Sequence, residues 1–186
     1  MRIIGGNFKG KKILLPRDKK TRPLRDLVKE SIFNLIKHSK KIDIDIKESI
    51  VLDLFSGSGS FGIECLSHQA KTVIFFENYL EAISILKKNL KILKNNENFK
   101  ILHKDCFEYF NSNKIIDLQF DIIFIDPPFK ERRINEIIEI ILRKNLLSKN
   151  GVIIMHRHKN DNVKITNKIK ILEKRNYGIS NIFFCN

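Results

Sequence analysis

The sequence predicts an α/β protein built on one sheet of mostly parallel strands. Short apolar runs alternate with segments whose apolar residues recur at helical spacing, which is typical of parallel strands joined by crossover helices. No long linker or low-complexity tract divides the 186 residues, and a chain of this length can bury a proper core. We therefore expect residues 1–186 to form a single domain.

A basic extension, residues 1–37, precedes the predicted sheet. Residues 3–8 and 12–15 flank a glycine and predict a β-hairpin. Pro23 suits the first turn of a helix, which we expect to reach about Lys37. A polar stretch then leads into the sheet.

The remaining elements follow from the alternating pattern. Core strands are expected from residue 51 into a glycine-rich loop, and over residues 72–76, 99–103, 120–125 and 151–155. Helices are expected over residues 60–68, 79–95 and 132–145. Residues 168–173 and 179–184, parted by Tyr177-Gly178, predict a closing antiparallel hairpin and hence one reversed edge strand.

The segment Asp126-Pro127-Pro128-Phe129 directly follows the apolar run 120–125. Neither proline has an N–H for a strand ladder, so the strand must stop and the corner is stiff. Ligands bind at the carboxyl ends of strands in open α/β sheets. This corner offers a carboxylate, backbone carbonyls and an aromatic face, which can hold a planar ring and its exocyclic amine. The alternative is a common strand-ending turn.

A glycine-rich loop with Gly57, Gly59 and Gly62 follows the first core strand. This spacing fits the dinucleotide fingerprint, which alone is a weak signal. Asp53 argues against a nicotinamide cofactor, because a fixed negative charge would repel a pyrophosphate. The same charge would hold the ammonium group of a cationic sulfonium amino acid.

Acidic residues end two further strands. Glu77 lies where a carboxylate takes up ribose hydroxyls, and Asp105 can accept a hydrogen bond from an adenine amino group. Each alone has a plainer interpretation as a helix cap or a solvated turn residue. With Asp53 and Asp126 they make four acids at the ends of four successive strands, which favours a shared ligand site.

Residues 52–59, together with the Asp126–Phe129 motif, resemble the S-adenosylmethionine-dependent amino-group methyltransferases. The amino-terminal segments 2–12, 21–23 and 29–34 narrow the resemblance to the RsmD family, and it extends over nearly the whole chain. The resemblance implies a Rossmann-like class I methyltransferase sheet of order 3-2-1-4-5-7-6, with strand 7 antiparallel. It also implies the family's reaction, methylation of N2 of one guanine (guanine 966 by convention) in 16S ribosomal RNA, as naked RNA or within the small subunit or its assembly intermediate.

The resemblance assigns roles to particular residues. The residues implied to bind S-adenosylmethionine are Asp53, Phe55, Gly57, Gly59, Glu77, Asp105 and Cys106. The target base would be held by Asp126, Pro127, Pro128 and Phe129. We hypothesise that the Asp126 carboxylate and the Pro127 carbonyl each accept a hydrogen bond from one N–H group of the guanine amine, while Phe129 stacks on the ring. Asp126 or water would then take the proton.

The chain departs from the usual family pattern at three places. Leu24 and Arg25 stand where threonines are usual, and Asn78 stands where a charged residue is usual. His156 ends the fifth strand, where many members have a glutamate. These departures bear on substrate docking rather than on the two main motifs.

Charge indicates a nucleic-acid partner. The net charge is +14, and residues 1–29 hold ten basic residues against two acidic ones. Such a local excess is typical of backbone binding, although lysine enrichment in an AT-rich genome would also raise the total. The residues that we expect to contact RNA are Arg2, Lys9, Lys11, Lys12, Arg17, Arg22 and Arg25.

Other features exclude several classes of protein. No apolar run is long enough for a membrane span, and no signal peptide is evident. The cysteines, Cys65, Cys106 and Cys185, lack paired spacing and suit buried positions in a reducing cytosol. We expect His156 and His158 to face opposite sides of a strand, which is poor geometry for a metal. The sequence thus favours a cytoplasmic monomer without a metal.

Three alternatives stay open. An adenine-N6 methyltransferase on DNA or RNA would use the same motif, but often has asparagine for the aspartate and carries target-reading insertions. A non-catalytic RNA-binding or ribosome-assembly protein on the same fold would not need the intact acids. A nicotinamide dehydrogenase is the least favoured by the residues.

Overall fold

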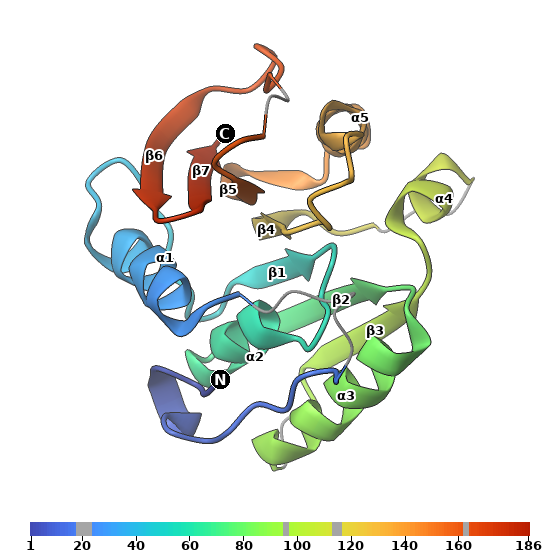
Figure 1. Ribbon diagram of the computed structural model, residues 1–186. Coiled ribbons are helices and arrows are strands. Elements are labelled where there is room, and N and C mark those ends of the chain that lie inside the picture. Colours follow the sequence, from blue (N-terminus) through green and yellow to red (C-terminus); the bar gives the residue numbers. More distant parts are fainter. Residues whose placement is uncertain (18–23, 95–96, 113–116, 162–163) are drawn as a thin grey trace.

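The computed structural model describes residues 1–17, 24–94, 97–112, 117–161 and 164–186. In these residues a seven-stranded sheet has the order β3-β2-β1-β4-β5-β7-β6, which confirms the expected order (Figure 1). The strands are β1 (Ile50–Asp53), β2 (Thr72–Glu77), β3 (Phe99–His103), β4 (Phe120–Ile125), β5 (Leu147–His158), β6 (Ile171–Tyr177) and β7 (Ser180–Cys185).

The five strands β3, β2, β1, β4 and β5 are parallel. Strand β7 runs antiparallel to both β5 and β6. This confirms the antiparallel strand 7 that the family resemblance implied. The hairpin pattern had placed the reversed strand at the edge, and that was wrong, because β6 forms the edge. Strand β6 also lies a few residues later than expected, because its polar residues 174–176 are exposed at that edge and leave no apolar pattern.

Helices cover both faces of the sheet (Figure 1). They are α1 (Asp26–His38), α2 (Ser60–Ser67), α3 (Leu80–Leu90), α4 (Cys106–Asn111) and α5 (Ile134–Arg143), with short 3₁₀ turns η1 (Gly6–Phe8) and η2 (Lys91–Leu93). Helices α1, α2 and α3 pack on one face, and α4 and α5 on the other. Successive residues of a strand alternate between the two cores, so Ile122 joins the first and Ile123 the second.

The predicted amino-terminal hairpin was wrong as a pair of strands. The described segment holds a single antiparallel bridge, Arg2 to Lys12, and residues 6–8 form η1. The backbone N–H groups of Ile4 and Gly5 donate instead to the carboxylate of Glu64 in α2, at 2.7 to 3.1 Å. Residues 1–3 still pair with residues 10–13 through three backbone hydrogen bonds, and the carboxylate takes the Gly5 N–H that a longer ladder would need.

Two helices differ from expectation. Helix α1 begins at Asp26, and Pro23 lies outside the described residues. Helix α4 was not predicted, because six residues are too few to show a helical period. It matters for the site, since its first turn begins directly after Asp105.

Candidate functional site

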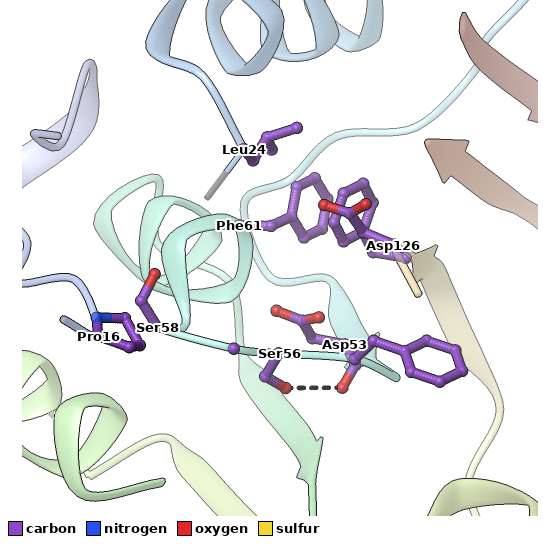
Figure 2. Close-up of a pocket in the computed structure, with 10 residues that line it drawn as sticks. Pro16, Leu24, Asp53, Ser56, Ser58, Phe61 and Asp126 are labelled. Atoms are coloured by element: carbon purple, nitrogen blue, oxygen red, sulfur yellow. Dashed lines mark hydrogen bonds between the residues drawn. The ribbon is translucent and has the colours of Figure 1, made fainter. Parts of the chain in front are cut away.

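A pocket opens at the carboxyl ends of β1 and β4, at the strand tips where the sequence placed a site (Figure 2). The cavity volume proper is about 40 Å³, within an envelope of about 420 Å³ that includes space open to solvent. Its lining residues are Pro16, Leu24, Asp53, Phe55, Ser56, Gly57, Ser58, Phe61, Phe124 and Asp126. The structure therefore brings four predicted site residues to one cavity: Asp53, Phe55, Gly57 and Asp126.

Asp53 ends β1 and is only 1 % exposed. Its Oδ2 accepts a hydrogen bond from the Gly62 N–H at 3.2 Å, while the buried Oδ1 has no partner among the described residues. Burial raises the pKa of Asp53 to about 8; the charges of Asp126 and Glu77 add to the rise, and the backbone N–H groups of Gly62 and, more weakly, Phe55 oppose it. A buried acceptor without a donor is costly, so this atom suits a ligand that brings a donor or a positive charge.

The loop between β1 and α2 approaches the pocket with two glycines in left-handed conformation. Gly57 has φ +54°, and a side chain there would point into open space. Gly59 has φ +80°, and a Cβ there would overlap the Leu86 side chain. Gly57 thus leaves the backbone open beside the cavity, whereas Gly59 allows α2 to start close to α3.

Glu77 ends β2 and holds this loop. Its Oε2 accepts the Gly57 N–H at 2.7 Å, and its Oε1 accepts the N–H groups of Asn78 and Tyr79 at 3.0 and 2.9 Å. Three donors fix the carboxylate at the strand tip. A carboxylate can accept about four hydrogen bonds, so capacity for a ligand hydroxyl remains.

Asp105 fulfils the plainer of its two interpretations, because it caps α4. Its Oδ1 accepts the N–H groups of Phe107 and Glu108 at 2.9 and 3.1 Å. Its Oδ2 accepts the side-chain amide of Asn78 at 3.2 Å, so a chain of hydrogen bonds links Asp105 through Asn78 to Glu77. Asp105 and Cys106 do not line the pocket, and burial raises the pKa of the Cys106 thiol.

The Asp126–Phe129 corner follows β4 as expected. Asp126 lines the pocket, and its Oδ1 lies 2.8 Å from Nδ1 of His156 in β5. Pro127 is buried, Pro128 is exposed and Phe129 is half-buried, and none of the three lines the pocket. The Phe129 ring packs edge-on against His158, with centroids 4.8 Å apart.

The expectation about the two histidines was wrong. The rings of both His156 and His158 contact Phe129. Residues two apart in a strand share a face, because the side-chain period is two. Among the described residues, no group of three or more His, Cys, Asp or Glu is placed to hold a metal ion.

Comparison with known proteins places the chain in a family. A family model described as "Conserved hypothetical protein 95", which represents the RsmD family, matches residues 1–186. The chain belongs to the RsmD family. The "Ribosomal RNA small subunit methyltransferase D" of Haemophilus influenzae is 32 % identical over 180 residues, which are 96 % of this chain and 90 % of that protein.

Other relatives agree with this membership. The "Putative rRNA methyltransferase YlbH" of Bacillus subtilis is 31 % identical over 183 residues, 98 % of this chain and 96 % of that protein. The solved structure of "putative methylase HI0767" from Haemophilus influenzae matches with a TM-score of 0.77 at 28 % identity, over 99 % of this chain and 96 % of that one. The fold of this RsmD family member is that of class I methyltransferases.

The predicted RNA-contacting residues of this RsmD family member divide into three groups. The exposed ones are Arg2, Lys9, Lys12, Arg17 and Arg25. Lys11 is half-buried: its Nζ donates to the Ile92 carbonyl at 3.0 Å and lies over the Phe8 ring. Arg22 lies outside the described residues.

None of the described helices combines the length and apolar character needed to cross a membrane.

Sequence reasoning missed the buried groups that dock the amino-terminal extension. Lys29 of α1 and Glu64 of α2 are both 0 % exposed and form an ion pair at 3.0 Å. Asn89 of α3, also buried, bonds the backbone of Leu14 and donates to the Ser58 carbonyl in the glycine loop. A charged residue within the apolar stretch of α2 was the available signal for Glu64. No local sequence pattern indicated the role of Asn89.

Proposed function

We propose that this protein transfers a methyl group from S-adenosylmethionine to the N2 amine of a guanine in 16S ribosomal RNA, the position known as guanine 966. The observation that carries the proposal is the pocket shared by Asp53, with its unpartnered Oδ1, and Asp126 of the Asp-Pro-Pro-Phe corner. Relatives over most of the chain bear names that specify a methyltransferase of small-subunit ribosomal RNA.

The residues present fit the cofactor. Asp53 holds its ammonium group, because Oδ1 is a buried acceptor in need of a donor. Gly57 and Gly59 let the backbone approach the methionine part, with Phe55 beside them. Glu77 takes the ribose with its remaining acceptor capacity. The adenine is assigned to Asp105 and the amide of Cys106 by the family resemblance alone, because these two residues do not line the pocket. When bound, the cofactor supplies an electrophilic methyl group whose departure leaves a neutral thioether.

The chain's own residues orient the amine. The Asp126 carboxylate and the Pro127 carbonyl each accept a hydrogen bond from one N–H group of the amine. These two contacts favour a pyramidal nitrogen with an available lone pair. Phe129, with Pro128 beside it, stacks on the base and fixes the angle of attack. Placing two reactants in line supplies much of the acceleration. As the N–C bond forms, one N–H bond breaks, and Asp126 or a water molecule takes that proton.

The base reaches this corner only when it is unstacked, so the substrate is a single-stranded or loop guanine. The exposed basic residues of the extension neutralise RNA phosphates near the pocket, where Pro16 and Leu24 form part of the wall. The protein acts as a monomer in the cytoplasm on 16S RNA or an assembling small subunit.

Location of the methyl group tests the proposal. The protein is incubated with labelled S-adenosylmethionine and 16S RNA, either naked or within small-subunit particles from cells lacking the activity. Digestion and mass mapping should place one label on N2 of guanine 966. Label on adenine N6, or none on either substrate, would contradict the proposal. Calorimetry would then separate a binding protein from one without a cofactor site.

A further inference from the structure

His156 lies behind the proposed catalytic carboxylate and is 2 % exposed. Its Nδ1 is 2.8 Å from Asp126 Oδ1, and its Nε2 is 2.8 Å from Ser180 Oγ. Ser180 is the first residue of β7, the strand that pairs with β5 in antiparallel fashion, opposite His158. One ring therefore bridges the end of β4 and the start of β7.

The carboxylate partner decides that Nδ1 of the ring carries a proton. An ionised carboxylate can only accept hydrogen bonds, so the Nδ1 that faces it must carry the proton. A neutral ring then presents a lone pair at Nε2, and the Ser180 hydroxyl donates to it. In this arrangement both ring nitrogens and the serine hydroxyl are satisfied, in a site where an unsatisfied polar atom would be costly.

This contact determines what Asp126 can do in the pocket. Oδ1 is engaged from behind by His156, which leaves Oδ2 for a substrate amine. Asp53 lies in the same pocket, and the charge of Asp126 raises the pKa of Asp53, so the two carboxyl groups repel each other when ionised. Without a donor behind it, Asp126 would be free to rotate away from the orientation that faces the pocket.

We propose that His156 is a positioning residue for methyl transfer: Ser180 orients its ring, and its Nδ1–H locks Asp126 with Oδ2 toward the target amine. This inference rests on the proposed function, since it assigns the amine-binding role to Asp126. It concerns the transfer step and not cofactor binding, because His156 touches the corner and does not line the pocket.

The tautomer provides a test that needs no activity. Long-range ¹H–¹⁵N spectra of the full-length protein are recorded at pH 8, above the range in which an unperturbed imidazole titrates. The His156 resonances should show a protonated Nδ1 and an unprotonated Nε2, and Asp126→Ala should abolish this preference. A protonated Nε2 with a bare Nδ1 in the wild-type protein would overturn the proposal.

Kinetics test the positioning role. His156→Asn keeps a donor near the position of Nδ1, whereas His156→Leu has no donor and a similar bulk. The leucine variant should lower kcat about 10- to 100-fold, with KM for both substrates changed less than about threefold. The asparagine variant should restore most of kcat. Equal kcat in all three proteins, or equal losses in both variants, would overturn the proposal.

Two controls keep the test decisive. Ser180→Ala leaves the histidine in place and removes only its outer partner, so it should lower kcat by a smaller factor than His156→Leu; a full kcat there would contradict the role given to Ser180. Thermal unfolding checks that each variant is folded.

If the wild-type protein methylates no RNA, the proposed function fails, while the tautomer of His156 still shows whether its Nδ1–H donates to Asp126. If Asp126→Ala is inactive and His156→Leu is fully active, only this inference fails.

Discussion

At the scale of single residues, the chemistry of the pocket depends on how buried each carboxyl is. Asp53 is almost fully buried and has one unpartnered oxygen, whereas the side chain of Asp126 is 15 % exposed and hydrogen-bonded to His156. Two residues of the same type are therefore prepared for different tasks. A fully buried carboxyl suits a cationic partner that restores its charge, and a partly exposed one suits a neutral amine.

The pKa of Asp53 predicts a pH dependence of cofactor binding. At about 8 it lies above neutrality, so the free protein holds a proton on Asp53 at pH 7. A bound ammonium group favours the ionised carboxylate, so binding releases that proton. Affinity for S-adenosylmethionine should rise by up to about tenfold per pH unit between pH 6 and 7.5, where α-ammonium groups largely keep their charge.

Calorimetry in buffers of different ionisation enthalpy measures this release, which should approach one proton at pH 7. Asp53→Asn should bind more weakly and lose the pH dependence over the same range. An affinity of the wild-type protein that is the same at pH 6 and pH 7.5 would contradict this account of Asp53.

At the scale of elements, the loop between β1 and α2 separates two uses of glycine. Both Gly57 and Gly59 have positive φ, which costs an alanine roughly 1–2 kcal/mol. Gly59→Ala also places a methyl group on the fully buried Leu86, so it should lower the free energy of unfolding more than Gly57→Ala. Gly57→Ala should instead reduce cofactor affinity. Urea unfolding measures the stability of the two variants, and calorimetry measures their cofactor affinity. Equal stabilities would contradict the prediction, because they would show that the Leu86 side chain moves to relieve the overlap.

The amino-terminal extension depends on one buried ion pair between α1 and α2. Glu64→Gln removes the charge opposite Lys29 and leaves a buried ammonium group uncompensated. We expect the free energy of unfolding to fall by about 3–5 kcal/mol. The amides of Ile4 and Gly5, which donate to Glu64, should exchange faster with solvent.

Glu30→Gln on α1 is the matched control, because Glu30 is exposed. Its effect should stay within about 0.5 kcal/mol. If Glu64→Gln were as mild as this control in urea unfolding, the extension would not be anchored by the pair.

At the scale of the whole molecule, the sequence was sufficient where a signal is local. The apolar runs located β3 and β4 to the residue, and the motif residues Asp53 and Asp126 meet in one pocket. It was insufficient where distant segments compete for the same group. Glu64 takes the Gly5 amide that a longer hairpin would use, and Asp105 is committed to a helix too short to predict. The strand order came from family resemblance, since periodicity does not encode it.

The uneven charge of the molecule predicts how RNA binding depends on salt. Replacing Lys9, Lys12 and Arg17 by alanine lowers the net charge from +14 to +11 within the extension (14 − 3 = 11). If each contacts one phosphate, the slope of log affinity against log salt should decrease by about 2–3. Filter binding over a range of salt concentrations measures the slope.

The matched control replaces Arg143, Lys149 and Lys170 by alanine. These residues are exposed and lie outside the extension, and their loss changes the net charge equally. It should leave the slope near the wild-type value. Equal effects of the two triple variants would mean that total charge, rather than the extension, governs RNA binding.

The most direct test of the central claim is to measure methyl transfer and cofactor binding on one preparation of Asp126→Ala, beside the exposed control Asp43→Ala. The account predicts that Asp126→Ala lowers the rate of methyl transfer to 16S RNA by about 100-fold or more. The same variant should bind S-adenosylmethionine with an affinity within about threefold of wild type, because Asp53 is intact. Asp43→Ala should match wild type in both measurements. A variant that lacks the Asp126 carboxylate and still transfers methyl groups at more than half the wild-type rate would contradict it.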